Sequence, residues 1–487
     1  MQNRVSNMRG RLKFVKKQVF NPYLPSWEYI PDGEPYVFDG RVYIYGSHDY
    51  FRGNAYCLGD YVCWSAPEED LGDWRCEGTI YRKTQDPANP DGSMCLYAPD
   101  VTQGPDGRYY LYYVLDKLRV VSVAVCDTPA GQYEFYGYVR YPDGTRLGER
   151  DGDEPQFDPG VLTEGSKTYL YTGFCAIGDV SRTGPHGVTL GPDMLTIEEG
   201  PVRIAPSQPF SAGSGYETHE FFEAPSIRKR GDLYYFIYSS VRMFELCYAV
   251  SRSPMEGFTY GGVIVTNNDL HIDSYKPAEK PMFYGGNNHG SMVEIGGQWY
   301  IFYHRHTDGT NFSRQGCMEP LSFREDGSII QAEMTSCGGN GGPLQGRGTY
   351  PAYIACQLFT AGGEDPLTTG APGEWMDCRF PKITQDGRDG DEEPGYVANL
   401  VSGATAGFRY FDCHGISRVS VRVRGYCKGA ICVRTAWDGP VLGIIPVKFT
   451  NVWKEYTAQV SIPDGVQSLY FTYEGQGAAN LASFTLE

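Results

Sequence analysis

The chain has 487 residues, among them 61 glycines and 38 tyrosines, and carries a formal net charge of −17. This length exceeds that of one ordinary domain, and the acidic charge argues against nucleic acid or an anionic membrane as a partner. No run of eighteen apolar residues is present, which argues against a membrane-spanning helix.

The N-terminal residues 1–20 are predicted to form a tail or a strand that closes the following domain. Residues Met1 to Gln18 are basic and polar and contain no apolar stretch of the kind found in secretory signals. This pattern favours a cytoplasmic protein. A secreted form whose signal has been removed is the alternative.

Residues 21–335 repeat one phrase five times. Each copy has a small apolar run, a turn with glycine and an aromatic-rich run of period two, which is typical of a β-hairpin. The copies are Pro35–Tyr45, Pro99–Tyr113, Pro159–Tyr171, Pro225–Tyr238 and Gly290–Tyr303. One hairpin cannot bury both of its faces, so neighbouring copies must pack together. Five copies that close in a ring predict a five-bladed β-propeller.

Acidic residues stand at or just before the first strand of three copies. They are Asp32, Asp158 and Glu223. The innermost strands of a propeller converge on its axis, so we expect these three carboxylates to meet in one funnel. Each also has a simpler interpretation: Asp32 as a turn residue, Asp158 as a loop cap, and Glu223 as the ion-pair partner of Arg228.

The last part of the chain, residues 345–487, follows a glycine-rich connection at Cys337–Pro343. Its strands alternate apolar and polar residues, as in Val419–Arg424, Ala430–Arg434 and Ser468–Tyr473. We expect a β-sandwich of the jelly-roll type. The whole chain is therefore predicted to be all-β, with no convincing helical period.

The five motifs of residues 21–330 resemble glycoside hydrolase family 43, whose five-bladed propellers cut arabinose- and xylose-containing glycans. The matching phrases are Tyr45-Gly-Ser-His-Asp49, Ala98-Pro-Asp-Val101, Asp158-Pro-Gly-Val161, Glu223-Ala-Pro-Ser-Ile227 and His289-Gly-Ser291. The tail resembles a family 6 carbohydrate-binding module at Trp453, Gly475–Gly477 and Asn480–Phe484. This second likeness is weaker, because the usual Ala-Glu opening is not visible.

The first resemblance implies an inverting glycoside hydrolase with three carboxylates in named roles. Asp32 would be the base that activates water, and Glu223 the acid that protonates the leaving oxygen. Asp158 would raise the pKa of Glu223 by charge repulsion and orient it. Blade one departs from the family pattern at Pro31–Pro35, where a two-residue slip would give the base role to Glu34 instead.

The resemblance also implies contacts to sugar and a metal ion. Tyr97 would line the sugar pocket, and Arg314 would donate hydrogen bonds to sugar hydroxyls; a surface salt bridge is the alternative for Arg314. His289 would lie near the axis, beside the sugar and as a ligand or neighbour of a structural calcium ion; a hydrogen-bonded axial histidine without metal is the alternative. A second calcium site in the C-terminal module is also implied, and no organic cofactor.

The function that follows from the resemblance is an exo-acting α-L-arabinofuranosidase that acts on arabinoxylan-derived oligosaccharides. Two alternatives stay open: a β-D-xylosidase, and a non-catalytic sugar-binding propeller. Retaining five-bladed enzymes of the levansucrase and invertase kind are disfavoured, because Glu223 is followed by Ala224-Pro225 rather than by cysteine.

Overall fold

The computed structural model describes residues 17–360 and 380–487. Residues 1–16, which hold most of the expected tail, and residues 361–379 lie outside this description. Apart from four short 3₁₀ turns (Lys83–Gln85, Gln208–Phe210, Gly338–Asn340 and Ala352–Ile354), the regular elements of the described part are β-strands, so the all-β prediction is confirmed. No helix in this part is long and apolar enough to cross a membrane.

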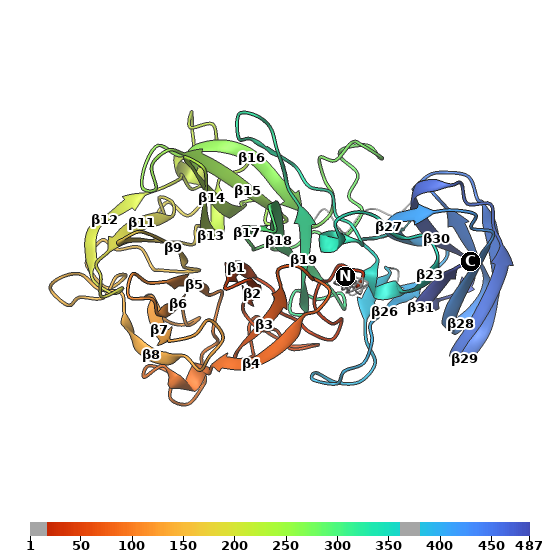
Figure 1. The fold of residues 1–487 in the computed structure, drawn as a ribbon, viewed down its shortest axis with the longest axis horizontal. Helices are drawn as coiled ribbons and strands as arrows, with labels where there is room; N and C mark the ends of the chain where they lie inside the picture. The colour runs from red at the N-terminus through yellow and green to blue at the C-terminus, as the bar shows by residue number, and fades with distance from the viewer. Residues whose placement is uncertain (1–16, 361–379) are drawn as a thin grey trace, which may run out of the picture.

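Four blades of the propeller are four-stranded antiparallel sheets arranged around one axis (Figure 1). Blade one contains β1 (Glu34–Phe38), β2 (Arg41–Tyr45), β3 (Tyr61–Pro67) and β4 (Arg75–Tyr81). Blade two contains β5 (Asp100–Gln103), β6 (Tyr109–Tyr113), β7 (Ser122–Cys126) and β8 (Glu134–Tyr138). Blade three contains β9 (Gly160–Glu164), β10 (Lys167–Thr172), β11 (His186–Leu190) and β12 (Ile197–Arg203). Blade four contains β13 (Phe221–Arg230), β14 (Leu233–Ser240), β15 (Glu245–Ser251) and β16 (Thr259–Thr266).

Blade five has three strands: β17 (Met292–Ile295), β18 (Gln298–His306) and β19 (Arg314–Pro320). A short pair, β20 (Ser322–Phe323) with β21 (Ile329–Ile330), follows it. The ring closes where Gly33 forms a parallel bridge with Gly290, which brings blade one beside blade five. The five-bladed propeller is therefore confirmed, and the first two strands of each blade coincide with the five repeated phrases.

The N-terminal segment takes the place of a fourth strand beside β19. The Tyr23 amide donates to the Gly316 carbonyl, and the Asn21 side chain both accepts from the Met318 amide and donates to the Met318 carbonyl. The Gln315 amide group also donates to the Ser26 carbonyl, at 2.6 Å. The outer edge of blade five is thus paired with a segment from the start of the chain.

Separate apolar clusters fill the spaces between successive blades. Tyr113 and Leu111 lie in the cluster between blades one and two, Tyr112 in the next, and Phe236 between blades three and four. This is why the aromatic runs of the repeated phrase are needed: alternate side chains of each second strand pack against the blades on either side.

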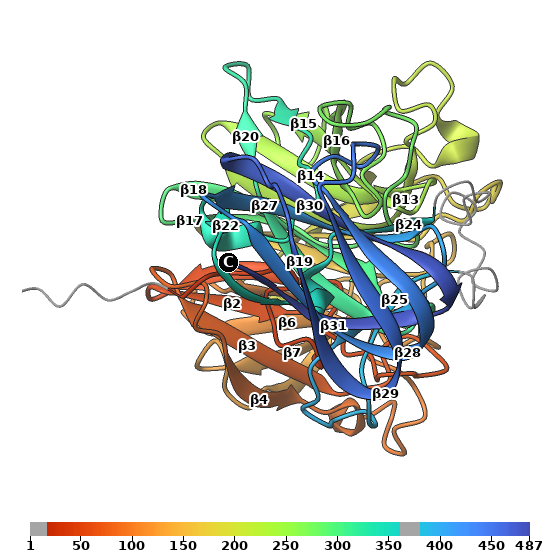
Figure 2. The same cartoon turned by 90° about the vertical axis from the view of Figure 1, so that its right-hand side faces the viewer.

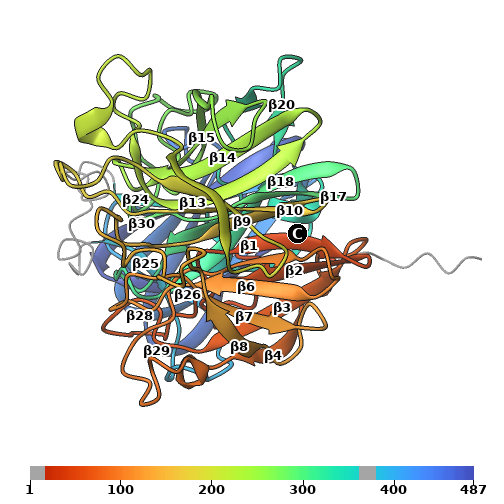
Figure 3. The ribbon, with the colours of Figure 1, turned by 90° about the vertical axis from the view of Figure 1, so that its left-hand side faces the viewer.

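The C-terminal domain is one curled sheet of ten strands, consistent with the expected sandwich, and Figure 2 views it from the front. Its strands are β22 (Leu344–Gln345), β23 (Gly348–Pro351), β24 (Gln357–Thr360), β25 (Lys382–Thr384), β26 (Tyr396–Leu400), β27 (Ala404–Cys413), β28 (Arg418–Arg434), β29 (Gly443–Gln459), β30 (Gly465–Gly477) and β31 (Ala479–Leu486). Seen from the opposite side, the blades stand in front of this sheet (Figure 3).

The C-terminal domain shares one continuous apolar core with blades four and five. This cluster runs from Tyr235 and Ile301 in the propeller to Phe408 and Phe484 in the curled sheet. Buried Arg409 crosses the boundary, with its guanidinium 3.0 Å from Asp269 and 2.7 Å from the Met334 carbonyl. The two domains therefore share a buried apolar core in addition to the chain segment that connects them.

Candidate active site

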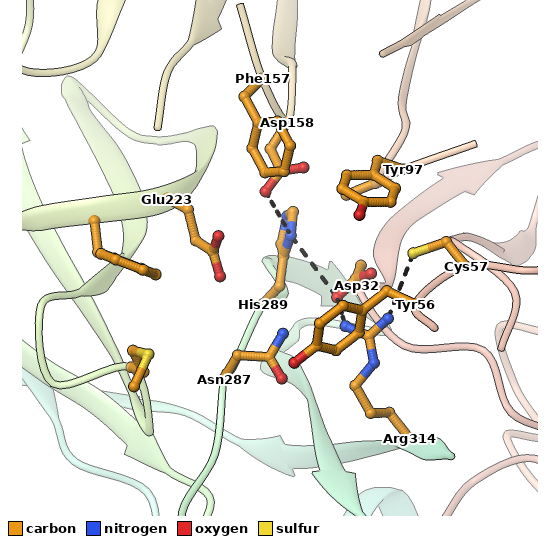
Figure 4. Close-up of a pocket in the computed structure, with 13 residues that line it drawn as sticks. Asp32, Tyr56, Cys57, Tyr97, Phe157, Asp158, Glu223, Asn287, His289 and Arg314 are labelled. Atoms are coloured by element: carbon orange, nitrogen blue, oxygen red, sulfur yellow. Dashed lines mark hydrogen bonds and ion pairs between the residues drawn. The ribbon is translucent and has the colours of Figure 1, made fainter. Parts of the chain in front are cut away.

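Asp32, Asp158 and Glu223 line one cavity of about 290 Å³ at the propeller axis (Figure 4). Each lies at the start of an innermost strand: Asp32 precedes β1, Asp158 precedes β9, and Glu223 is the third residue of β13. Asp32 and Asp158 have positive φ angles of 58° and 44°, and Ala224 beside Glu223 has φ 64°. Left-handed backbone is uncommon outside glycine, and it recurs at all three entries to the axis.

Asp32 is held by charged and polar neighbours from blades one and five. Its Oδ1 lies 3.0 Å from the Arg314 guanidinium and 3.3 Å from the His304 ring, and its Oδ2 accepts from the Ser47 hydroxyl. Burial alone would raise the pKa of Asp32, but the Arg314 charge and His304 hold it well below its usual range. Asp32 is therefore an ionised carboxylate throughout the neutral and mildly acidic range.

Glu223 and Asp158 lie in less compensated surroundings. Burial raises the pKa of Glu223 to about 7, with the negative charge of Asp32 adding to the rise and His289 opposing it. Burial also raises the pKa of Asp158 well above its usual range. The expected rise of the Glu223 pKa is present, but burial and the Asp32 charge cause it, and Asp158 does not. The site thus combines one carboxylate with a lowered pKa, Asp32, with two carboxyls whose pKa values are raised.

His289 lies at the centre of the carboxylates (Figure 4). Its Nδ1 is 3.9 Å from Asp32 and 3.8 Å from Asp158, and its Nε2 is 3.8 Å from Glu34. Burial would lower the pKa of His289, but these three carboxylates raise it to about 9. With its side chain 7% exposed, His289 is a buried part of the cavity lining.

Glu34 lies outside the cavity lining, in a buried ion pair. Its Oε2 is 2.6 Å from the Arg228 guanidinium and 3.1 Å from the Ser226 hydroxyl. Arg228 therefore pairs with Glu34 and leaves Glu223 without the partner that the simpler interpretation of Glu223 requires. Of the two blade-one carboxylates weighed from the sequence, Asp32 faces the cavity and Glu34 faces blade four.

Tyr97 and Arg314 both line the cavity, with different freedom to meet a ligand. The Tyr97 ring packs edge-on against Phe157 at 5.3 Å between centroids. The Arg314 side chain is 2% exposed. Its guanidinium donates to the two carboxylate oxygens of Asp49, at 2.8 and 2.9 Å, and also to Asp32. Arg314 is thus neither a surface salt bridge nor a mainly free donor, and most of its hydrogen-bonding capacity orients acidic side chains.

Several cavity residues were not predicted from the sequence. They are Tyr56, Cys57, Phe157, Phe222, Met243 and Asn287. Phe157 and Phe222 directly precede Asp158 and Glu223, so an aromatic before each acid was a usable signal. Tyr56 and Cys57 come from an irregular segment between β2 and β3, where no periodic pattern marks a residue as facing the axis.

The axial residues offer oxygen donors to a hard cation. Glu34 Oε1 is buried and has no hydrogen-bond partner among the described residues, and it faces His289 Nε2. Calcium prefers such carboxylate oxygens and takes about 6–8 of them, and Glu34 Oε1 would supply one. The predicted ligand role of His289 itself is not tested by this geometry.

Comparisons with known proteins agree with this geometry. The model of glycosyl hydrolases family 43 matches residues 29–329. A Thermoclostridium stercorarium protein named xylosidase/arabinosidase is 72% identical over 472 residues, which cover 97% of this chain and 99% of that protein. A solved family 43 β-xylosidase/α-arabinofuranosidase from a compost metagenome, in complex with xylotriose and described as a calcium-free form, is 26% identical, with a TM-score of 0.51 over 65% of this chain and 98% of its own.

A further solved structure has the same two-domain extent. It is a family 43 arabinoxylan arabinofuranohydrolase from Bacillus subtilis in complex with cellotetraose, with 22% identity and a TM-score of 0.52. The match covers 96% of this chain and 97% of that one. At this identity the likeness concerns the fold, which here includes the C-terminal sheet as well as the propeller.

Proposed function

Because the chain belongs to glycosyl hydrolases family 43 and is a glycoside hydrolase, we propose that it is an inverting, exo-acting α-L-arabinofuranosidase. Its substrates would be arabinoxylan-derived oligosaccharides, from which it releases L-arabinofuranose side chains. The observation that carries the proposal is the division of protons among the axial carboxylates: Asp32 is held ionised while Glu223 keeps its proton to about pH 7.

This division matches the two roles that glycoside hydrolysis requires. An ionised Asp32 accepts a proton from water as the water attacks the anomeric carbon. Protonated Glu223 gives its proton to the leaving oxygen as the glycosidic bond breaks. The water supplies the hydroxyl of the released sugar, and its second proton passes to Asp32, so each carboxyl must exchange one proton with solvent before the next turnover.

The neighbours of these two residues keep them in place during the reaction. Arg314 and Ser47 fix the Asp32 carboxylate from two sides. Asp158, which lies 3.8 Å from the His289 ring that Asp32 also faces, would orient Glu223 and, in its neutral form, donate a hydrogen bond to a sugar hydroxyl. Tyr97, Phe157 and Phe222 offer apolar faces to the sugar ring.

The size and closure of the cavity support exo action. A volume of about 290 Å³ is near the lower end of the range of about 300–1,000 Å³ for small-molecule sites. In this proposal buried His289 stands at the inner end, one terminal sugar enters, and the rest of the glycan stays outside. A long glycan would not pass through such a site in the middle of its backbone.

The alternative activity, β-D-xylosidase, has support of its own. The Thermoclostridium stercorarium relative is named for both activities, and the two pentoses present similar hydroxyls to a small pocket. The same acid, base and inverting chemistry serves either sugar. The name of that relative makes a second activity on terminal xylose the leading alternative.

A calcium ion beside His289 is part of the proposal. Glu34 and His289 would hold it, with Asp158 close by, and it would supply positive charge that steadies the axial carboxylates. The pKa of His289 is raised to about 9, so its ring would have to lose a proton before a nitrogen could bind the ion. Thermal unfolding with calcium, and after chelation, tests the site: a rise in Tm on adding calcium is expected, and no change would remove the ion from the proposal.

Product analysis tests the activity and its stereochemistry together. We expect L-arabinose as the main monosaccharide from arabinoxylo-oligosaccharides, and proton NMR of the nascent sugar to show the inverted anomer first. Xylose as the main product would favour the xylosidase alternative. A retained anomer before mutarotation would overturn the assignment of Asp32 as base, and no release of either sugar would favour a sugar-binding propeller.

A further inference from the structure

Blade four holds a second cluster of polar side chains, outside the cavity described above. His219 precedes β13, and Glu245 and Cys247 lie on β15. His219 Nδ1 is 2.6 Å from Glu245 Oε1, and the Cys247 sulfur is 3.5 Å from the same oxygen and 3.9 Å from His219 Nδ1. Their donor atoms all lie within 4.8 Å of one another.

A fourth residue faces this cluster from the segment that follows β16. His271 Nε2 lies 3.8 Å from Glu245 Oε2. Both atoms are buried, and neither has a hydrogen-bond partner among the described residues. The Glu245 side chain is fully buried, so an unpartnered carboxylate oxygen here is costly unless something binds it.

The simplest interpretation of the cluster is a hydrogen-bonded Glu245, and it accounts for only half of that carboxylate. Oε1 accepts from the Ser240 hydroxyl at 2.6 Å and pairs with His219. Glu245 Oε2 and His271 Nε2, which face each other, have no hydrogen-bond partner in this interpretation. A ligand that accepts electron pairs from oxygen, nitrogen and sulfur at once satisfies both atoms.

Two imidazoles, one thiolate and one carboxylate are a donor set that zinc prefers. Structural zinc is bound in tetrahedral sites by cysteine, histidine and acidic side chains, whereas calcium takes oxygen ligands only. The four residues come from three separate segments with long spacings between them. No CxxC or histidine-rich motif therefore marks the site in the sequence.

We propose that blade four binds one Zn²⁺ ion through His219, Glu245, Cys247 and His271. Binding would convert the Cys247 thiol to a thiolate and release its proton to solvent. The ion would tie the turn before β13 to β15 and to the segment after β16. Because β13 carries Glu223, and Met243 of the cavity lies two residues before Glu245, the ion would fix the cavity-facing end of blade four.

Cobalt substitution of the full-length protein tests the sulfur ligand directly. We expect chelator-treated protein to take up about one equivalent of Co²⁺ and to develop a thiolate-to-cobalt charge-transfer band in the near ultraviolet, which Zn²⁺ then abolishes. Cys247→Ser should lose the band. Cys76→Ser, which removes an exposed cysteine on blade one, is the matched control and should keep it.

Zinc titration followed by thermal unfolding tests the four proposed ligands together. A stoichiometric rise in Tm of the wild type is expected, because a ligand that binds only the folded state stabilises it. His271→Gln should weaken zinc affinity by about tenfold or more. Absence of the thiolate band in the wild type, a band that survives in Cys247→Ser, or a Tm that zinc leaves unchanged would each overturn the proposal.

Discussion

At the scale of single residues, the neighbours of each carboxyl decide whether it keeps its proton at neutral pH. Asp32 and Glu223 line the same cavity and are both buried, yet only Asp32 has the Arg314 guanidinium at 3.0 Å. This contact, together with His304, keeps Asp32 ionised, whereas Glu223 keeps its proton to near neutral pH. The two pKa values diverge as an acid–base pair requires.

The pH profile should therefore show a descending basic limb near pH 7. Glu223 acts only when protonated, and its protonated fraction falls as pH rises through its pKa of about 7. Asp32 remains ionised well into the acid range, so the acid limb should lie far lower. Measurement of kcat/KM against pH on an arabinoxylo-oligosaccharide checks both limbs.

Glu223→Gln is the control for that assignment. It should lower kcat on natural linkages by about 10²–10⁴-fold and have less effect on nitrophenyl glycosides, whose leaving group needs little protonation. On those substrates the basic limb should also disappear. A limb near pH 7 that persists in Glu223→Gln would assign it to another group.

The two acidic residues of blade one should respond differently to neutralisation. Asp32→Asn should abolish turnover, because Asp32 faces the cavity. Glu34→Gln should retain more activity but lose about 3–5 kcal/mol of stability, because it removes the closer carboxylate partner of buried Arg228 and leaves only Asp100 at 4.0 Å. Kinetics and urea unfolding of both variants check this; an inactive but stable Glu34→Gln beside an active Asp32→Asn would reverse the roles.

At the scale of elements, the repeated hairpins were readable from the sequence because their cause is local. Glycine turns and aromatic alternation specify β9 with β10, or β17 with β18, without knowledge of the rest of the fold. Because the first strand of each blade lies at the propeller axis, acidic residues at the starts of these strands meet at the axis. The cavity positions of Asp32, Asp158 and Glu223 follow from this regularity.

The remainder of the site depends on contacts between distant segments, which no local pattern encodes. Arg314 meets Asp49 across 265 positions of sequence, and Tyr56 reaches the cavity from an irregular segment. The strand boundaries of the C-terminal sheet also differ from expectation: Val419–Arg424 and Ala430–Arg434 are parts of one long strand, β28. The first half of β28 pairs with β31 and the second half with β30, so the apolar pattern is interrupted and does not show that the two segments form one strand.

The connection between β18 and β19 links the cavity wall to the C-terminal domain through Asp308. Its carboxylate pairs with Arg52 at 3.1 Å and with Lys382 at 3.2 Å, and it accepts from the Thr384 hydroxyl. Asp308→Asn should therefore lose about 1–3 kcal/mol of stability and raise KM, since Arg52 precedes the cavity residues Tyr56 and Cys57. Urea unfolding and kinetics measure these effects.

The matched comparison is Glu149→Gln, which removes an exposed partner of Arg146. Exposed pairs contribute little, so its stability should change by less than about 1 kcal/mol and its KM should not change. Equal losses in the two variants would show that Asp308 has no special role between the domains.

At the scale of the whole molecule, the continuous core makes the C-terminal domain part of the propeller's stability. Truncation after residue 340 would remove Phe359 and Tyr470 from their packing with buried Met282, and Arg409 from buried Asp269. We expect the shortened protein to be poorly soluble or to unfold at a markedly lower Tm, because exposed apolar area is lost stabilisation. A stable and fully active truncated propeller would contradict this.

The pairing of residues 21–26 with β19 has a consequence for how separate molecules meet. An outermost strand with free amide and carbonyl groups is a template on which another chain can add a strand. Here the Asn21 side chain and the Tyr23 amide already occupy that edge. Residues 21–26 thus cover this edge, and engineering that trims or loosens them would leave β19 open to pairing with another chain.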